Sequence, residues 1–510
     1  MRLVSSALNV AFFTALSRLT GFFRDVLMAQ YIGTSFVMDA LVIAIKIPSF
    51  LRRIFAEGAL NSSFVPIYSA MHVAQKEEAK EFIKDILSLM VGILVVLIFA
   101  FELVMPFIVT LIVPGVGEEV FSLAVSFSRI TFPFILLISL TALFSGVLNT
   151  HDRFGAAASS QIAGNLFIVF IMKLVNPSML EDGKVVATAI MGSGFVQLLW
   201  VYIPCHLMGI RPSLRKPREN QAMKNFGKRM IPAAVGSAVL QINLFIDTII
   251  ASLLPMGTIS YLYYADRLYN LPISITGTAL GTVLLPMLSR QWRENNVEGA
   301  MHNQNRAIEF AMLITLPAML GLIYLSHPLI MVIFERGAFD QASSIATAET
   351  LAGFASGLPA YILIKIFNTS FFARQDTVTP IKVALAGMVV NVVLNFVLIY
   401  KYKHLGIAIA TSSASWFNAA VLVYLLKKRN FVSFDAALWK FLAKILIPCC
   451  LTFLVLFIVK PLVTPYLHST DGIHIRFIAL AVLVSSGLLT YLLAAWSSGL
   501  LRFKEYTSAS

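Results

Sequence analysis

The chain has 510 residues, of which 58% are hydrophobic and only 13% are charged, and 39 basic against 26 acidic residues give a formal net charge of +13. Soluble proteins carry about 25% charged residues, so this composition excludes a soluble enzyme and a disordered chain. The three cysteines all lie in apolar runs, which excludes a secreted disulfide scaffold. We therefore predict an all-α polytopic membrane protein.

Apolar stretches recur along nearly the whole chain. A helix needs about 20 residues to cross the hydrocarbon core of a bilayer. In chain order we predict about 14 spans, at 5–32, 36–70, 86–113, 123–149, 157–177, 185–208, 230–254, 259–289, 307–326, 346–372, 382–400, 405–426, 437–460 and 474–500. The first span follows Arg2 in the manner of a signal peptide, but no clear cleavage site comes after it. We expect this span to be retained.

Basic residues in the short loops predict the orientation. The 211–229 loop carries seven of them, and further ones lie near 76–84, 290–306, 374–382, 427–429 and 502–504. The alternate loops near 30–36, 115–119 and 254–260 have none, although Arg336 and three pairs, Lys173/Lys184, Lys401/Lys403 and Lys460/Arg476, are exceptions. Because cytoplasmic loops are enriched in Lys and Arg, we predict that both termini are cytoplasmic.

The 211–229 segment is also the most polar part of the chain, and it is predicted to be a hinge between two lobes. The predicted organisation is an N-terminal six-helix lobe at 1–210, the basic cytoplasmic linker at 211–229, a C-terminal six-helix lobe at 230–429 and an additional two-helix segment at 430–510. Many transporters consist of two such halves with the binding site between them.

Ionisable residues inside the spans are the first candidates for a binding site. Each costs at least about 2.5–3.5 kcal/mol in the hydrocarbon, so it faces the bundle interior or water. They concentrate in the first two spans: Arg18, Arg24 and Asp25, then Asp39, Lys46, Arg52, Arg53 and Glu57. Asp39, Lys46 and Arg53 follow one another at seven-residue steps and share a helix face, unless Pro48 kinks the helix. Asp266 and Arg267 take the corresponding place in the eighth span.

This surplus of cations predicts a central cavity for an anionic ligand. The guanidinium group of arginine binds two phosphate oxygens at once, so phosphate is the favoured ligand chemistry. The alternative is mutual salt bridging, which would pair Arg24 with Asp39, Arg18 with Asp25, and Arg267 with Asp266. Arg52 and Arg53 would then only mark the cytoplasmic end of a helix.

A second set of polar residues supplies oxygen atoms. Asp247 lies in the seventh span, Asn391 and Asn395 are four residues apart in the eleventh, and Thr411 lies in the twelfth. Such oxygens suit a hard cation such as Na⁺, and we predict a candidate Na⁺ site from these four residues. Alternatively, Asp247 is protonated and each asparagine forms a hydrogen bond to a neighbouring helix.

Motifs for other chemistry are missing from the sequence. It contains no phosphate-binding loop for ATP, no zinc-spaced Cys/His set and no nucleophile elbow. We therefore expect a transporter and not an enzyme, with no cofactor other than the candidate Na⁺. The basic 211–229 loop could bind RNA or anionic lipid, but the orientation rule accounts for it, so no nucleic-acid partner is expected.

Several motifs resemble the MurJ/MviN family of lipid II flippases. They are Ser17-Arg18 followed by Gly21–Asp25, Lys46–Ala59 continuing to Phe64–Pro66, Tyr263–Leu268 continuing to Gly281-Thr282 and Leu285-Pro286, Phe334–Phe339, and Ala373–Thr377 continuing to Thr379-Pro380. The resemblance covers residues 1 to about 430 and is strongest over 14–66. Small departures occur at Ser49 and over Leu60–Ser63, and they leave the charged positions intact.

The resemblance implies a MATE-like fold of the multidrug/oligosaccharidyl-lipid/polysaccharide exporter superfamily. It also implies transport of lipid II, an undecaprenyl-pyrophosphate-linked disaccharide pentapeptide, for cell-wall synthesis, and a location in the bacterial plasma (inner) membrane. In that family, arginines matching Arg18, Arg24, Arg52 and Arg267 line the cavity, with Asp25 and Asp39 as functional acids. We include Ser17, Lys46 and Arg53 among the expected substrate-binding residues, and Glu57 and Asp266 among the functional acids. Expected partners are lipid II, membrane lipids and cell-wall synthesis or division proteins.

The sequence leaves other functions open. A flippase for a different polyprenyl-pyrophosphate-linked glycan would need the same arginines. A cation-coupled exporter of small molecules would have the same fold but would require an acidic or aromatic cavity, which the arginine surplus disfavours. A non-transporting assembly scaffold would have no need for charges within the membrane.

Overall fold

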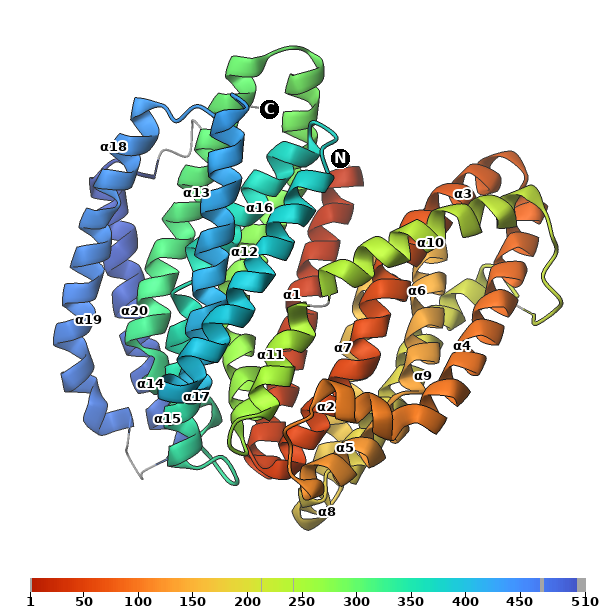
Figure 1. Ribbon diagram of the computed structural model, residues 1–510, viewed down its shortest axis with the longest axis horizontal. Coiled ribbons are helices and arrows are strands. Elements are labelled where there is room, and N and C mark those ends of the chain that lie inside the picture. Colours follow the sequence, from red (N-terminus) through yellow and green to blue (C-terminus); the bar gives the residue numbers. More distant parts are fainter. Residues whose placement is uncertain (1, 212, 242, 468–471, 502–510) are drawn as a thin grey trace. The chain divides into compact units, whose positions relative to one another are not determined.

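The computed structural model describes residues 2–211, 213–241, 243–467 and 472–501, and for some residues in helices, Glu57 among them, it describes the backbone alone. Every regular element in these ranges is a helix (Figure 1). The chain forms two compact units. The first comprises residues 1–260 with 336–339, and the second comprises 261–335 with 340–510.

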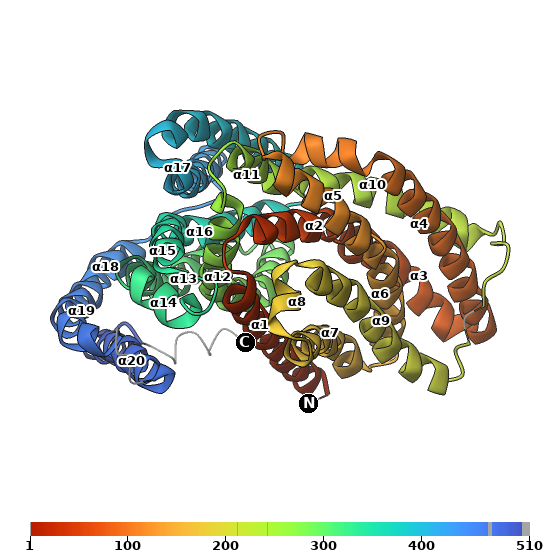
Figure 2. The same ribbon diagram turned by 90° about the horizontal axis from the view of Figure 1, so that it is seen from below.

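The first unit is a bundle of helices. Helix α7 packs against both α1 and α9, and α2 packs against α5 (Figures 1 and 2). Helix α10 packs against η1 and α3, so the seventh predicted span is part of this unit. Its elements are α1 (Arg2–Ile32), α2 (Phe36–Arg52), the π-helix η1 (Arg53–Leu60), α3 (Asn61–Ala74), α4 (Lys76–Ile112), α5 (Glu118–Thr131), α6 (Phe134–Thr150), α7 (Phe154–Leu174), α8 (Pro177–Glu181), α9 (Lys184–Leu207), α10 (Gln221–Gln241) and α11 (Asn243–Ser252).

The second unit contains the remaining helices. They are α12 (Thr258–Arg293), which starts in the first unit, α13 (Val297–Tyr324), α14 (Ser326–Phe334), α15 (Gln341–Ala355), α16 (Leu358–Phe372), α17 (Val378–Lys428), α18 (Ala436–Lys444), α19 (Leu446–Leu467) and α20 (Ile473–Ser497). Helix α17 is interrupted at Lys403, whose backbone is non-helical (φ 47°, ψ −127°). The predicted spans 382–400 and 405–426 lie on either side of this interruption.

Helices α19 and α20 pack side by side and against α13 and α14 (Figures 1 and 2). Leu325, Leu456 and Leu483 form a buried apolar cluster at this junction. The hydroxyl of Tyr491 also donates a hydrogen bond to the backbone carbonyl of Leu313, 2.6 Å away. The two-helix segment is therefore fixed to the second unit by both apolar and polar contacts.

Length and composition confirm a multi-pass membrane protein. Among the described residues, nine helices are long and apolar enough to cross a bilayer. Large apolar side chains on α4 point outward, with Leu103 81% and Phe107 71% exposed, as lipid-facing residues do. The number of about 14 spans remains a prediction.

The basic linker is held against the first unit. Arg215 lies between two carboxylates of α4: its Nε and Nη2 donate to Asp85 Oδ1 at 2.9 and 2.7 Å, and its Nη1 bonds to Glu81. Arg218 Nη2 also donates to Glu81 Oε2 at 2.7 Å. Asp85 is fully buried, so Arg215 neutralises a charge that has no access to water.

The compact units differ from the predicted lobes over residues 230–260. The sequence suggested a division at the polar linker, whereas the contacts divide the chain after Ser260. The lobes at 1–210 and 230–429 and the segment at 430–510 remain predictions.

The motif around Ala373–Thr377 forms the loop between α16 and α17. The Arg374 guanidinium lies 3.5 Å from the ring centroid of Trp292 and 4.1 Å from that of Phe431. Asp376 accepts hydrogen bonds from Thr379 N at 2.9 Å and Arg429 Nη1 at 2.6 Å. Burial raises the pKa of Asp376, but these hydrogen bonds outweigh it and lower the pKa to about 2. This motif therefore has a structural role.

Candidate functional site in the membrane helices

A charged cluster joins the middle of α1 to α7. Arg24 binds Asp25 through two nitrogens, Nε at 3.0 Å and Nη2 at 2.7 Å, and donates to Asn165 Oδ1 of α7 through Nη1 at 3.1 Å. Asp25 is only 1% exposed. The structure thus pairs Arg24 with its neighbour in sequence, which differs from the Arg24–Asp39 pair considered from the sequence.

The same two helices are also connected about two turns earlier in α1. Asn165 Nδ2 donates to the backbone carbonyl of Ser17 at 3.2 Å, and the Ser17 hydroxyl donates to Gln161 Oε1 at 3.2 Å. A Cβ at Gly21 would lie 3.3 Å from Asn165 Nδ2, so the small residue permits this close approach. The α1–α7 contact therefore orients both Ser17 and Arg24.

Arg18 lies beside this network and lines a pocket of about 490 Å³. Its side chain is exposed, and Ser17 and Gln161 line the same pocket. The other lining residues are Thr14, Ser145, Asn149, Phe154, Ala157, Ala158 and Ser160. A guanidinium group surrounded by neutral polar and small side chains can bind an anion without competition from a carboxylate in that lining.

The charged residues of α2 and the first residue of η1 face the segment that returns along α11 and α10. Asp39 accepts hydrogen bonds at the start of α12, Lys46 Nζ donates to Thr248 Oγ1 of α11 at 2.7 Å, and Arg53 Nη1 donates to Gln241 Oε1 of α10 at 3.3 Å. The partners occur in reverse chain order because the two segments are antiparallel. The seven-residue spacing of the charges therefore places three polar contacts along one side of α2 and the start of η1.

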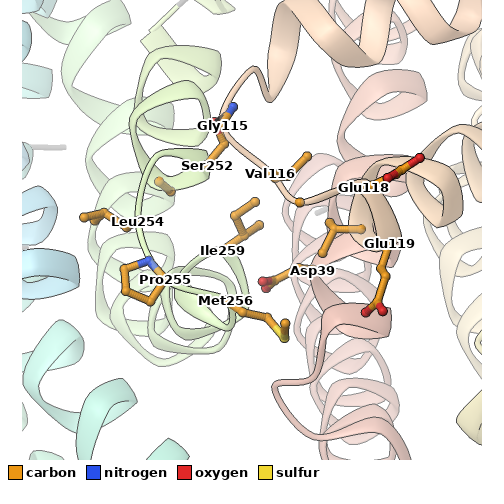
Figure 3. Close-up of a pocket in the computed structure, with 13 residues that line it drawn as sticks. Asp39, Gly115, Val116, Glu118, Glu119, Ser252, Leu254, Pro255, Met256 and Ile259 are labelled. Carbon is orange, nitrogen blue, oxygen red and sulfur yellow. Dashed lines mark hydrogen bonds between the residues drawn. The ribbon is translucent and has the colours of Figure 1, made fainter.

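Asp39 accepts three hydrogen bonds near the start of α12. Its carboxylate accepts from Gly257 N at 2.7 Å, from Ser260 N at 2.9 Å and from the Ser260 hydroxyl at 2.5 Å. Gly257 directly precedes α12 and Ser260 lies in its first turn, where free N–H groups favour a negative charge. Asp39 is 3% exposed and lines a pocket of about 410 Å³ with Glu118 and Glu119 of α5 (Figure 3).

The end of α2 changes helix type. Arg52 is the last residue of α2 and is half-buried, and Arg53 begins the π-helix η1. The chain continues helically through Pro48, so the proline does not break the helix. The side chain of Glu57, in η1, lies outside the described residues.

In the second unit, α12 carries the expected charged pair. The Arg267 guanidinium lies 4.3 Å from the ring centroid of Tyr263, one helical turn away. Asp266 is half-buried, and its backbone carbonyl accepts from Asn270 Nδ2 at 2.9 Å. Stacking on a tyrosine ring holds the guanidinium group of this arginine in place.

Lys365 is a charged residue that our sequence reasoning missed. It lies in α16, its side chain is exposed, and its Nζ lies close to Gly277 of α12, where a Cβ would overlap it. The same rule that selected Arg18 and Arg24 would have selected Lys365, because it falls inside the predicted 346–372 span.

The four predicted Na⁺ ligands occur in both units. Asn391 Nδ2 donates to Thr411 Oγ1 at 3.1 Å, and Asn395 Nδ2 donates to Asn391 Oδ1 at 3.0 Å, all within α17. Both asparagines are buried. Asp247 lies in α11 of the first unit.

Comparison with known proteins identifies the family. The profile of the family described as "Lipid II flippase MurJ" matches residues 28–474. The chain belongs to the MurJ family. Two relatives are the "Probable lipid II flippase MurJ" of Rickettsia prowazekii, 36% identical over 92% of each chain, and the "Lipid II flippase MurJ" of Burkholderia cenocepacia, 34% identical over 84% of this chain and 85% of the relative.

Solved structures agree with this family and with the fold. A structure described as "Lipid II flippase MurJ, inward closed conformation" is 28% identical, with a TM-score of 0.78 over 95% of this chain and 97% of that one. An inward-facing multidrug resistance MATE family transporter of the MOP superfamily is 15% identical, with a TM-score of 0.67 over 84% of this chain and 99% of that one. The predicted MATE-like all-α fold is therefore confirmed.

Proposed function

We propose that this protein moves lipid II from the cytoplasmic to the outer leaflet of the bacterial plasma membrane, for cell-wall synthesis. Relatives across most of the chain are named lipid II flippases, which supports the substrate. The structural observation that carries the proposal is the arginine pair of α1: Arg24 is fixed by Asp25 and Asn165, and Arg18 is exposed in a pocket of about 490 Å³.

Arginine suits the pyrophosphate that links the lipid to its sugars. Its planar group donates to two phosphate oxygens at once, and it stays charged at any physiological pH. We assign Arg18, Arg24, Arg52, Arg53 and Arg267 with Lys46 and Ser17 to headgroup binding, and Asp25, Asp39, Glu57 and Asp266 to holding these cations and the helices that carry them.

The proposed transport mechanism is alternating access. The cationic residues bind the headgroup from the cytoplasmic side, and bound pyrophosphate screens the repulsion between arginines so that the cavity can close and reopen outward. The polyprenyl chain remains in the lipid. This direction assumes that both termini and the basic loops are cytoplasmic, as the distribution of Lys and Arg predicts.

Membrane potential and Na⁺ are the proposed driving forces. One elementary charge moved through 100 mV gains about 2.3 kcal/mol. The amide oxygen of buried Asn395 has no hydrogen-bond partner among the described residues, which supports a cation at Asn391, Asn395 and Thr411 of α17. Asp247 as the fourth ligand stays a prediction from the sequence. Cell-wall synthesis or division proteins remain proposed partners.

Depletion with complementation tests the function. Loss of the protein should leave lipid II inaccessible on the outer leaflet, measured with an externally added lipid II-specific probe or enzyme. Arg18→Ala and Arg267→Ala should fail to restore accessibility, whereas Arg211→Ala, an exposed linker residue, should restore it. Unchanged accessibility after depletion would overturn the proposal. If depletion left lipid II accessible but stopped another polyprenyl-pyrophosphate-linked glycan from reaching the outer leaflet, that glycan would be the substrate.

A further inference from the structure

Lys365 is a charged residue of the second unit that the proposed function has not used. It lies in the middle of α16, inside a predicted membrane span, and its side chain is exposed. A lysine exposed to hydrocarbon at such a position costs at least about 2.5–3.5 kcal/mol, so a charge there faces water or a ligand and not lipid. Lys365 is therefore a candidate for binding an anion.

Two contacts place this part of α16 beside α12. Tyr361, one turn before Lys365, packs edge-on against Tyr269 of α12, with 5.9 Å between the ring centroids. The Lys365 ammonium lies next to Gly277 of α12, where a Cβ would overlap it. The ammonium is the far end of a flexible side chain, so a larger residue at position 277 would push it aside. Glycine at this position leaves room for the ammonium against α12.

Gly277 ends a row of positions on one face of α12. Arg267, Asn270, Ser274 and Gly277 follow one another at steps of three and four residues, which places them on the same side of the helix. The first three are half-buried. Asn270 and Ser274 each donate to the backbone carbonyl four residues earlier, at 2.9 and 2.5 Å. This face thus has neutral polar side chains in the middle and a cation at each end, Arg267 and Lys365.

The two cations are spaced for a ligand with two separate acidic groups. Ten residues separate Arg267 from Gly277, and α12 continues helically through Pro272 between them. At 1.5 Å per residue, this corresponds to about 15 Å along the helix. A fully extended pentapeptide spans at most about 17 Å. A ligand with a pyrophosphate near one end of such a peptide and a carboxylate at the other end can therefore reach both cations.

We propose that Lys365 binds the terminal carboxylate of the lipid II pentapeptide while Arg267 binds the pyrophosphate. The proposal rests on lipid II being the substrate, as proposed above, and assigns a site to the peptide. A lysine suits this role, because its compact ammonium binds a single carboxylate, whereas the planar group of arginine suits phosphate. Such a site would distinguish lipid II from other polyprenyl-pyrophosphate-linked glycans, which share the pyrophosphate but not the peptide.

A matched pair of substrates tests the site in the full-length protein. The first is lipid II, and the second is lipid II whose peptide ends in a carboxamide of the same length. In proteoliposomes, wild-type protein should flip the carboxylate form roughly tenfold more efficiently, as for a difference of about 1.4 kcal/mol. Lys365→Met should flip both forms at similar, low efficiency. Binding of the two lipids in detergent should show the same preference in wild type and its loss in Lys365→Met.

Two glycine variants provide a second test that keeps the charge of Lys365. Gly277→Ala should reduce the preference for the carboxylate, because its Cβ displaces the ammonium. Gly321→Ala is the matched control: Gly321 lies within α13 of the same unit, and nothing lies within 4 Å of its Cβ position. This variant should keep the wild-type preference. Similar unfolding temperatures for the variants would separate a lost contact from misfolding.

The outcomes separate this proposal from the proposed function. No preference in wild type, or an equal preference in wild type and Lys365→Met, would overturn the carboxylate site. If Lys365→Met does not fold, an unchanged preference in Gly277→Ala would overturn it instead. If wild-type protein flips neither lipid, the proposed function fails, whereas a binding preference that Lys365→Met loses would still support the carboxylate site.

Discussion

Asp39 shows how one charged side chain can be tested apart from its neighbours. In Asp39→Asn, an NH₂ group replaces one oxygen that now accepts from Gly257 N or Ser260 N. A buried donor then loses its acceptor, at a cost of about 1–3 kcal/mol. We expect a lower unfolding temperature in detergent. Glu119→Gln is the control, because Glu119 lines the same pocket but is exposed (Figure 3). Equal unfolding temperatures for both variants would contradict this account.

The sequence predicted which residues are charged within the membrane, but not what they contact. Arg24 and Asp39 stand out because charges are costly in hydrocarbon. Their partners Asn165, Gly257 and Ser260 do not stand out, because neutral polar and small residues are common in membrane helices. The fixed spacing of Asp39, Lys46 and Arg53 indicated a shared face, and only the fold shows that α10, α11 and the start of α12 cover it.

At the scale of elements, the polarity of a segment did not indicate its partners, and the hinge at 211–229 stays a prediction. The 211–229 linker is the most polar segment, and we expected a hinge there. Most of that polarity is basic, and Arg215 and Arg218 bind the carboxylates of Glu81 and Asp85 on α4. No spacing rule connects residues about 130 positions apart, so the pairing was not predictable from the chain.

Arg215→Ala should destabilise the first unit, because it leaves Asp85 buried without its cation. Removing one partner of a buried pair costs about 3–5 kcal/mol, and the lower value applies here because Arg215 is 22% exposed. Thermal unfolding should show a clear loss, and limited proteolysis should cut the linker sooner. Arg215→Met with Asp85→Leu should recover stability, whereas Arg211→Ala should have no effect. Intact proteolytic resistance of Arg215→Ala would show that other contacts hold the linker.

For the whole molecule, a window of about 20 apolar residues found the long helices but not the short ones. Helices α8 and α14 have five and nine residues, too few for such a window. The π-helix η1 lies inside the predicted 36–70 span, where hydropathy cannot distinguish one helix type from another. The division after Ser260 depends on contacts between segments that are far apart in the chain. A single sequence, read without an alignment, does not show such contacts.

Coupling to Na⁺ is the remaining prediction at this scale. If Asp247 binds a transported Na⁺, a tenfold inward Na⁺ gradient adds about 1.4 kcal/mol per ion to the driving force. Flipping in proteoliposomes at zero potential should then increase when Na⁺ replaces K⁺ outside. Asp247→Ala should remove the increase and leave basal flipping measurable.

Asp182→Ala is the matched control for this measurement, because Asp182 is exposed in the turn between α8 and α9. The reason for expecting a difference is chemical: Na⁺ needs several oxygen ligands, and the carboxylate is the only one of the four candidates that can neutralise its charge. If wild-type protein responds equally to Na⁺ and K⁺, or if Asp247→Ala keeps the response, the Na⁺ site is wrong. Membrane potential would then remain as the driving force, and a K⁺ diffusion potential imposed with valinomycin would test it in the same vesicles.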